Sequence, residues 1–144
     1  MPRSHSLRVR EVTRWTDFNE YEGEIQGELD GVPVTAYVLV APLEQWQRYQ
    51  PSTTLEVDAW VERTGAVEPL PSGGKPELTR VDGVVYDVAG TIVEQDGEQL
   101  QVESTLPIRV DLDMAAGAER PQLAVGDGVR VRGILKVDIP DDEA

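Results

Sequence analysis

Apolar and polar residues alternate along most of this chain with a period of two residues, which is typical of a β-strand with one buried face. The pattern is clearest over residues 126–139, where valines and leucines alternate with Arg130, Arg132 and Lys136. Gly133 interrupts this alternation and predicts a bulge or sharp bend at which a strand can curl. We therefore expect the stretch to be a strand of a barrel-like β domain.

The same alternation, bounded by turn residues, predicts further strands along the rest of the chain. The dipeptides Asp30-Gly31 and Asp96-Gly97 are strong signals for hairpin turns, each of which would join two consecutive strands. The predicted strands cover residues 7–12, 21–30, 32–40, 53–61, 78–81, 85–94, 99–104 and 107–113.

One short helix is expected over residues 42–50. Pro42 suits the first turn of a helix, and Pro51 ends it. Leu43, Trp46 and Tyr49 are spaced by three residues and therefore share one face. This face either closes the end of a barrel as part of its core or forms an exposed aromatic platform for a ligand.

A segment rich in proline and glycine, Pro69–Pro76, predicts a boundary between two halves of the chain. The halves resemble each other: Leu55–Val61 aligns with Val129–Leu135, and each half has an Asp-Gly turn. The predicted division is a first β unit over 1–70, a linker over 71–77, a second β unit over 78–139 and an acidic tail over 140–144.

The second half resembles the OB-fold (oligonucleotide/oligosaccharide-binding) superfamily in its order of strands and turns. The resemblance rests on Gly90, the turn Asp96-Gly97, the strand Ile108–Leu112 and the final stretch Gly126–Leu135. It implies an all-β chain of OB-like antiparallel barrels, two similar halves in tandem. It also implies a ligand groove across the second and third strands of each barrel, without specifying the ligand.

The net charge of the chain favours some classes of partner over others. The 27 acidic residues exceed the 13 basic ones, which gives a net charge of −14. Such a charge disfavours nucleic acid and anionic membranes as partners, and it suits a basic protein, a cation or simple solubility. The N-terminus lacks the apolar core of a signal peptide, and the longest apolar run is too short to span a bilayer, so a cytoplasmic protein is expected.

The residues needed for common catalytic and metal sites are scarce. The sequence has no cysteine and a single histidine, His5, in an N-terminal segment expected to be flexible. This composition excludes thiolate chemistry and argues against a Ser-His-Asp triad or a zinc site. We expect no cofactor and no metal, and an enzyme built on carboxylates is the least favoured hypothesis.

Candidate binding residues come from aromatic and basic positions on strand faces. Tyr37 and Trp60 are out of phase with the apolar residues of their strands, which makes them candidates for a surface site rather than the core. Two functions follow as hypotheses: an acidic, non-enzymatic module that engages a protein partner, or a protein that binds single-stranded nucleic acid. The second would use a basic cluster of Arg109, Arg130, Arg132 and Lys136.

Overall fold

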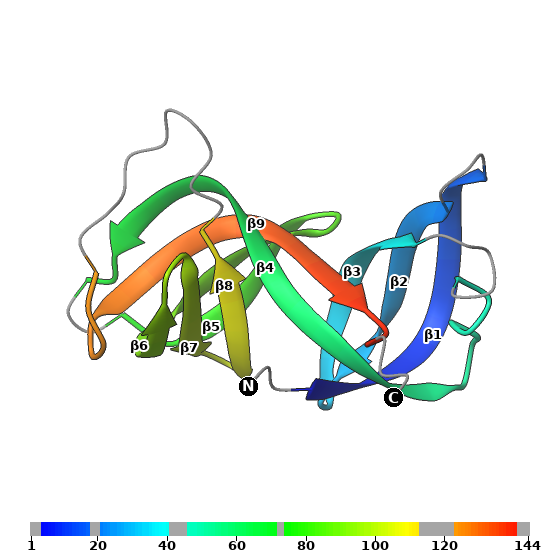
Figure 1. Ribbon diagram of the computed structural model, residues 1–144, viewed down its shortest axis with the longest axis horizontal. Helices are drawn as coiled ribbons and strands as arrows, with labels where there is room; N and C mark the ends of the chain where they lie inside the picture. Colours follow the sequence, from blue (N-terminus) through cyan, green and yellow to red (C-terminus); the bar gives the residue numbers. More distant parts are fainter. Residues whose placement is uncertain (1–3, 18–20, 41–45, 72–73, 113–122, 141–144) are drawn as a thin grey trace. The chain divides into compact units, whose positions relative to one another are not determined.

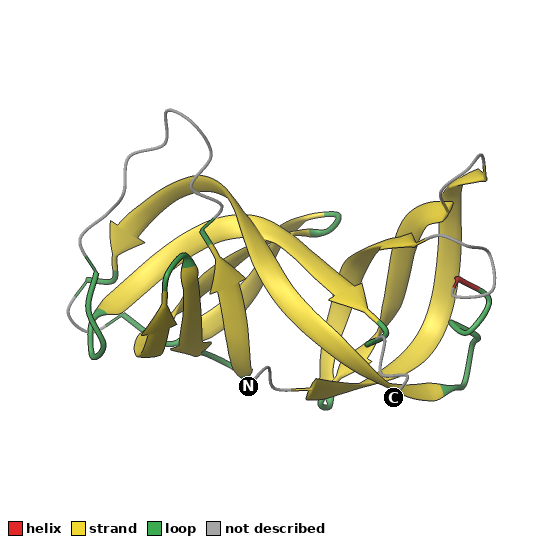
Figure 2. Cartoon of the chain, in the orientation of Figure 1, coloured by secondary structure: helices red, strands yellow, loops and turns green. Residues whose placement is uncertain are grey.

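The computed structural model describes residues 4–17, 21–40, 46–71, 74–112 and 123–140. These residues form nine strands and almost no helix, so the expected all-β class is confirmed (Figures 1 and 2). The strands are β1 (Ser4–Asp17), β2 (Tyr21–Leu29), β3 (Val32–Val40), β4 (Thr54–Pro69), β5 (Glu77–Asp82), β6 (Val85–Asp96), β7 (Gln99–Glu103), β8 (Pro107–Asp111) and β9 (Gly128–Asp138).

The chain forms two compact units, and the first is assembled from two separate stretches of the sequence. The first contains Met1–Ala59 with Leu135–Ala144, and the second contains Trp60–Ile134. These boundaries differ from the predicted division at residues 71–77 because β4 and β9 are long strands. Each of them contributes one end to the first unit and the other end to the second.

In the first unit, β1, β2 and β3 form an antiparallel meander. β1 also pairs with the beginning of β4, and β3 pairs in parallel with the end of β9. Alternate residues of these strands face inward and are buried because their side chains are apolar. The fully buried side chains of this core include Leu7, Val9, Ile25, Leu29, Val38, Val57 and Leu135.

In the second unit, the pairings close a ring of strands. β6, β7 and β8 are antiparallel neighbours, β8 lies parallel to β4, and β9 pairs with both β6 and β4 (Figure 1). β5 lies against the first half of β6. The core within this ring includes Val61, Val88, Ile92, Leu100, Val102, Ile108, Val110, Val129 and Val131.

Gly133 has a role that its sequence context did not predict. The register between β9 and β6 continues through Tyr86 and Gly133 without a shift, so there is no bulge on that side. A Cβ atom at Gly133 would lie only 2.2 Å from the backbone oxygen of Glu62 on β4. Glycine is therefore required here because the backbones of β4 and β9 approach closely.

The structure also corrects the expectations for His5 and for the helix over residues 42–50. His5 lies in strand β1 rather than in a flexible segment: it is buried, and its Nδ1 is 2.6 Å from Oδ2 of Asp30. Within the predicted helix, residues 42–45 are outside the described part of the chain. Trp46 is helical, but a turn follows it and Tyr49 is not helical, so the helix ends before Pro51 (Figure 2).

Candidate functional site

The outer face of the first unit carries a cluster of aromatic and charged side chains around Tyr37 on β3. The Tyr37 hydroxyl donates a hydrogen bond of 2.5 Å to Oε2 of Glu22 on β2. The ring of Trp15 on β1 is tilted against that of Tyr37, with centroids 5.6 Å apart. Three adjacent strands thus place a tryptophan, a tyrosine and a carboxylate side by side.

A bulge in β1 explains how Trp15 reaches this position. The register of β1 with β2 shifts between Arg14 and Thr16, which leaves Trp15 as the extra residue. Bulges of this kind redirect a side chain and increase the local twist of the strand. Trp15 remains 49% exposed even though its ring contacts Tyr37. The first strand predicted from the sequence ended at residue 12, so the sequence did not predict this contact.

Leu39 and Lys136 complete the cluster. Leu39 lies two residues beyond Tyr37 on the same face of β3 and is 48% exposed. Lys136 of β9 is the register partner of Tyr37, and its Nζ lies 5.5 Å from the centroid of the tyrosine ring. We call the set Trp15, Glu22, Tyr37, Leu39 and Lys136 the Tyr37 face.

The Tyr37 face combines exposed apolar surface with a carboxylate and an ammonium group. Large exposed apolar residues that lie together mark interaction surfaces more often than single ones do. Tryptophan and tyrosine are also the residue types most enriched among those that dominate binding energy at protein interfaces. This arrangement suits recognition of another molecule's apolar and basic groups.

The other aromatic cluster of the first unit belongs to the core. Trp46 and Tyr49 are 6% and 3% exposed, and their ring centroids are 6.2 Å apart. Burial raises the pKa of the Tyr49 hydroxyl well above its ordinary value. The interpretation of these two residues as an exposed ligand platform is therefore wrong, because their rings are covered.

The second unit has an aromatic and cationic pair of its own. Trp60 on β4 and Arg109 on β8 are register partners, and the guanidinium carbon lies 5.0 Å from the centroid of the indole ring. Both side chains are half-buried. Gln101 of β7 is the register partner of Arg109 on its other side.

The remaining two basic candidates, Arg130 and Arg132 on β9, form ion pairs with acidic residues. The Arg132 guanidinium donates to both carboxylate oxygens of Asp87 on β6, at 2.8 and 3.1 Å. This hydrogen bonding holds the pKa of Asp87 below its ordinary value. Nη2 of Arg130 lies 3.6 Å from Oε1 of Glu68 on β4.

The four basic candidates thus have separate surroundings. Lys136 lies beside Tyr37 in the first unit, Arg109 stacks on Trp60, and the guanidinium groups of Arg130 and Arg132 are near carboxylates. A continuous basic groove would need these side chains to present unneutralised charge together. Arg130 and Arg132 do not present unneutralised charge, because each lies near a carboxylate.

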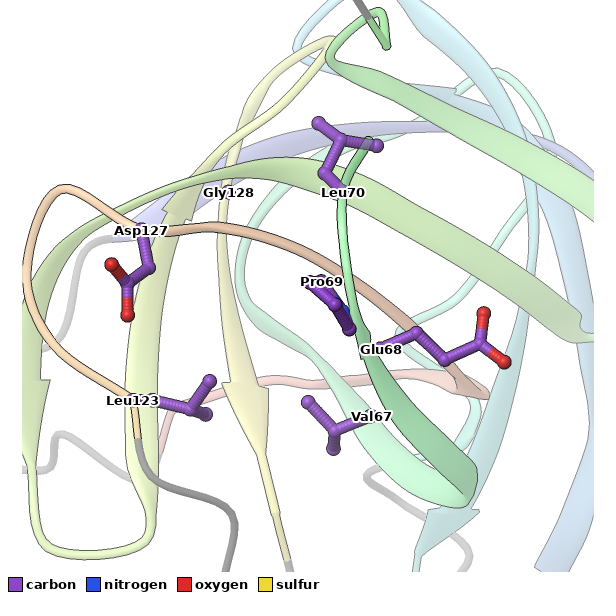
Figure 3. Close-up of a pocket in the computed structure, with 7 residues that line it drawn as sticks. All are labelled: Val67, Glu68, Pro69, Leu70, Leu123, Asp127 and Gly128. Atoms are coloured by element: carbon purple, nitrogen blue, oxygen red, sulfur yellow. The ribbon is translucent and has the colours of Figure 1, made fainter. Parts of the chain in front are cut away.

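A half-open cavity of about 460 Å³ lies in the second unit, where the end of β4 meets the beginning of β9 (Figure 3). The amide of Leu70 donates to the carbonyl oxygen of Gly128 at 3.0 Å and joins the two segments here. Val67, Pro69 and Leu123 provide apolar lining, and Glu68 and Asp127 add carboxylates.

The described residues contain no group of three or more histidine, cysteine, aspartate or glutamate side chains placed to hold a metal ion. They also include no helix with the length and apolar character needed to cross a bilayer. Comparison of the chain with models of protein families, with curated proteins and with solved structures found no match.

Proposed function

We propose that this protein is a non-enzymatic binding module of OB-like architecture that engages a protein partner through the Tyr37 face. The OB-like interpretation is supported by the strand pairings of the second unit, a ring of five strands with β5 added at one side. The proposal places the protein in the cytoplasm, as the sequence suggests.

The observation that carries the proposal is the exposure of Trp15 and Leu39 near Tyr37. Both side chains are about half exposed, and Glu22 is held beside them by the tyrosine hydroxyl. Apolar anchors with an adjacent carboxylate suit a segment that carries aliphatic or aromatic residues next to lysine or arginine. The net charge of −14 attracts such a segment over a longer range.

Binding of single-stranded nucleic acid is the alternative. The partly accessible aromatic residues Tyr37 and Trp60 favour it, because bases can stack on aromatic rings. The ion pairs of Arg130 and Arg132 weigh against it, since these cations already neutralise nearby carboxylates. One titration can compare a basic peptide with a single-stranded oligonucleotide.

The test is a titration of the full chain, followed by tryptophan fluorescence at low salt. The probes are a short peptide in which lysine alternates with leucine, the same peptide with glutamate in place of lysine, and a short oligo(dT). We expect saturable binding of the lysine peptide alone, weakened by Trp15→Ser and by Leu39→Ser. Val93→Ser is the matched control because Val93 is an exposed aliphatic residue of the second unit.

Two results would overturn the proposal. The first is binding of oligo(dT) with no binding of the lysine peptide, which would favour the nucleic-acid alternative. The second is binding of the lysine peptide that Leu39→Ser and Val93→Ser leave equally unchanged. Such binding would depend on net charge alone and would not need the Tyr37 face.

A further inference from the structure

We infer that the cavity between the end of β4 and the beginning of β9 binds a primary ammonium group carried on an aliphatic chain. The inference concerns a different site from the Tyr37 face and does not depend on it. It rests on the cavity's apolar walls and on the placement of the two carboxylates.

The walls of the cavity suit an aliphatic chain. Val67 and Leu123 point toward each other across it, and Pro69 lies on the same side as Val67 (Figure 3). All three side chains are apolar, and none carries a hydrogen-bonding group for a polar ligand. The volume of about 460 Å³ is within the range of small-molecule sites.

The two carboxylates of the lining differ in their surroundings. The carboxylate of Glu68 is directed away from Val67 and Leu123, and Oε1 of this residue lies 3.6 Å from Nη2 of Arg130 (Figure 3). The Glu68 carboxylate therefore already has a cationic neighbour, Arg130. Glu68 contributes its backbone and stem to the lining rather than its charge.

The Asp127 carboxylate lies on the same side of the cavity as Leu123 (Figure 3). Its Oδ2 accepts a hydrogen bond of 2.9 Å from the amide of Ala124, which fixes the side chain in a tight turn. Within the described part of the chain, no lysine or arginine pairs with Asp127. A fixed carboxylate next to an apolar wall, with no cationic partner among the described residues, suits a ligand with a positive charge and an aliphatic body.

The ammonium group would thus lie at Asp127, and the carbon chain would lie between Val67 and Leu123. A neutral alcohol of the same length keeps the apolar contact but lacks the charge. A carboxylate of the same length is repelled by Asp127 and by the net charge of the protein. Comparison of these three compounds separates the apolar contribution from the ionic one.

The experiment is a titration of the isotope-labelled full chain with hexylammonium, 1-hexanol and hexanoate, followed by NMR amide shifts. We expect saturable shifts from hexylammonium at Val67, Leu123 and Gly128, about fivefold weaker binding of 1-hexanol, and no binding of hexanoate. Asp127→Asn keeps an oxygen for the Ala124 amide and should bring hexylammonium to the affinity of 1-hexanol. Leu123→Ser should weaken both compounds.

Asp96→Asn is the control, because it removes the same charge from an exposed turn elsewhere in the unit. It should leave all affinities unchanged. Equal affinities for hexylammonium and 1-hexanol would overturn the inference, since the carboxylate would then have no role. Unsaturable shifts spread over many acidic residues, equally reduced by Asp96→Asn and Asp127→Asn, would overturn it as well.

Discussion

Tyr37 and Lys136 occupy the same register position of the parallel pair β3 and β9, with the ammonium nitrogen 5.5 Å from the centroid of the tyrosine ring. The parallel pair of the second unit, β4 and β8, repeats this relationship in the same order, with the aromatic residue on the earlier strand. There the aromatic residue is Trp60 on β4 and the cation is Arg109 on β8. Each unit therefore places one cation against one aromatic ring across its parallel strands.

The contact between Tyr37 and Lys136 should be measurable as a coupling in stability. We expect Tyr37→Leu and Lys136→Met, combined in a double-mutant cycle, to give a coupling of about 0.5–1 kcal/mol, the usual size for an exposed cation–π contact. The measurement is urea denaturation of the full chain. A cycle that uses Tyr37→Phe in place of Tyr37→Leu should give a coupling near zero, because phenylalanine keeps the ring that contacts Lys136 and removes only the hydroxyl bound to Glu22.

The pair of Asp87 and Arg132 predicts a dependence of stability on pH. Because the pKa of Asp87 is lower in the folded chain than in the unfolded one, the pair stabilises the fold above the unfolded pKa of about 3.9. That stabilisation should be lost as the pH falls through the lower, folded pKa. We expect the wild type to unfold at a higher temperature than Asp87→Asn at pH 7, and the difference to vanish in strong acid. A difference that stays constant from pH 7 into strong acid would contradict the assignment.

Gly133 should tolerate no side chain. A Cβ atom there would be 2.2 Å from the carbonyl oxygen of Glu62, so Gly133→Ala must push β4 and β9 apart. We expect a loss of about 1–3 kcal/mol, the usual cost of overpacking. Gly65→Ala is the matched control, because its Cβ would meet Arg132 at an ordinary 3.4 Å. Thermal unfolding of both variants compares them, and an equal loss would contradict the close approach of the strands.

His5 should stabilise the first unit through its contact with Asp30. The imidazole is buried, and the backbone amide of Ser6 donates to the other carboxylate oxygen of Asp30 at 2.8 Å. We expect His5→Ala to lower the free energy of unfolding by about 1–3 kcal/mol, because it leaves a cavity and a carboxylate without its ring partner. Hydrogen exchange should also become faster at the Asp30 amide, which donates to the Ser6 carbonyl at 2.8 Å. Unchanged exchange at this amide would show that the contact does not anchor the turn.

The alternation of residues predicted the strands well where one face is apolar throughout. Residues 32–40 were predicted as a strand and are β3, and residues 21–30 contain β2. β4 was predicted to end at Val61 but continues to Pro69, because its second half has exposed residues such as Thr64 and Ala66 and no apolar signal. Alternation reports burial, so it misses a strand that is held mainly by its hydrogen bonds.

Part of the candidate site could also be predicted from the alternation of residues along a strand. Tyr37 was found because it is out of phase with the valines of its strand, and Leu39 has the same phase. Trp15 could not be found this way, since only the bulge in β1 turns it toward Tyr37. The sequence also could not show that Arg130 and Arg132 meet Glu68 and Asp87, because pairing between distant strands is not encoded in local alternation.

The membership of β9 in both units has a consequence for synthesis on the ribosome. The first unit includes residues that are translated after the whole of the second unit. Its strand β3 therefore has no parallel neighbour until the end of β9 leaves the exit tunnel. A nascent chain stalled before Leu135 would hold an incomplete first unit, whose open edge of β3 would be exposed to chaperones and to other nascent chains.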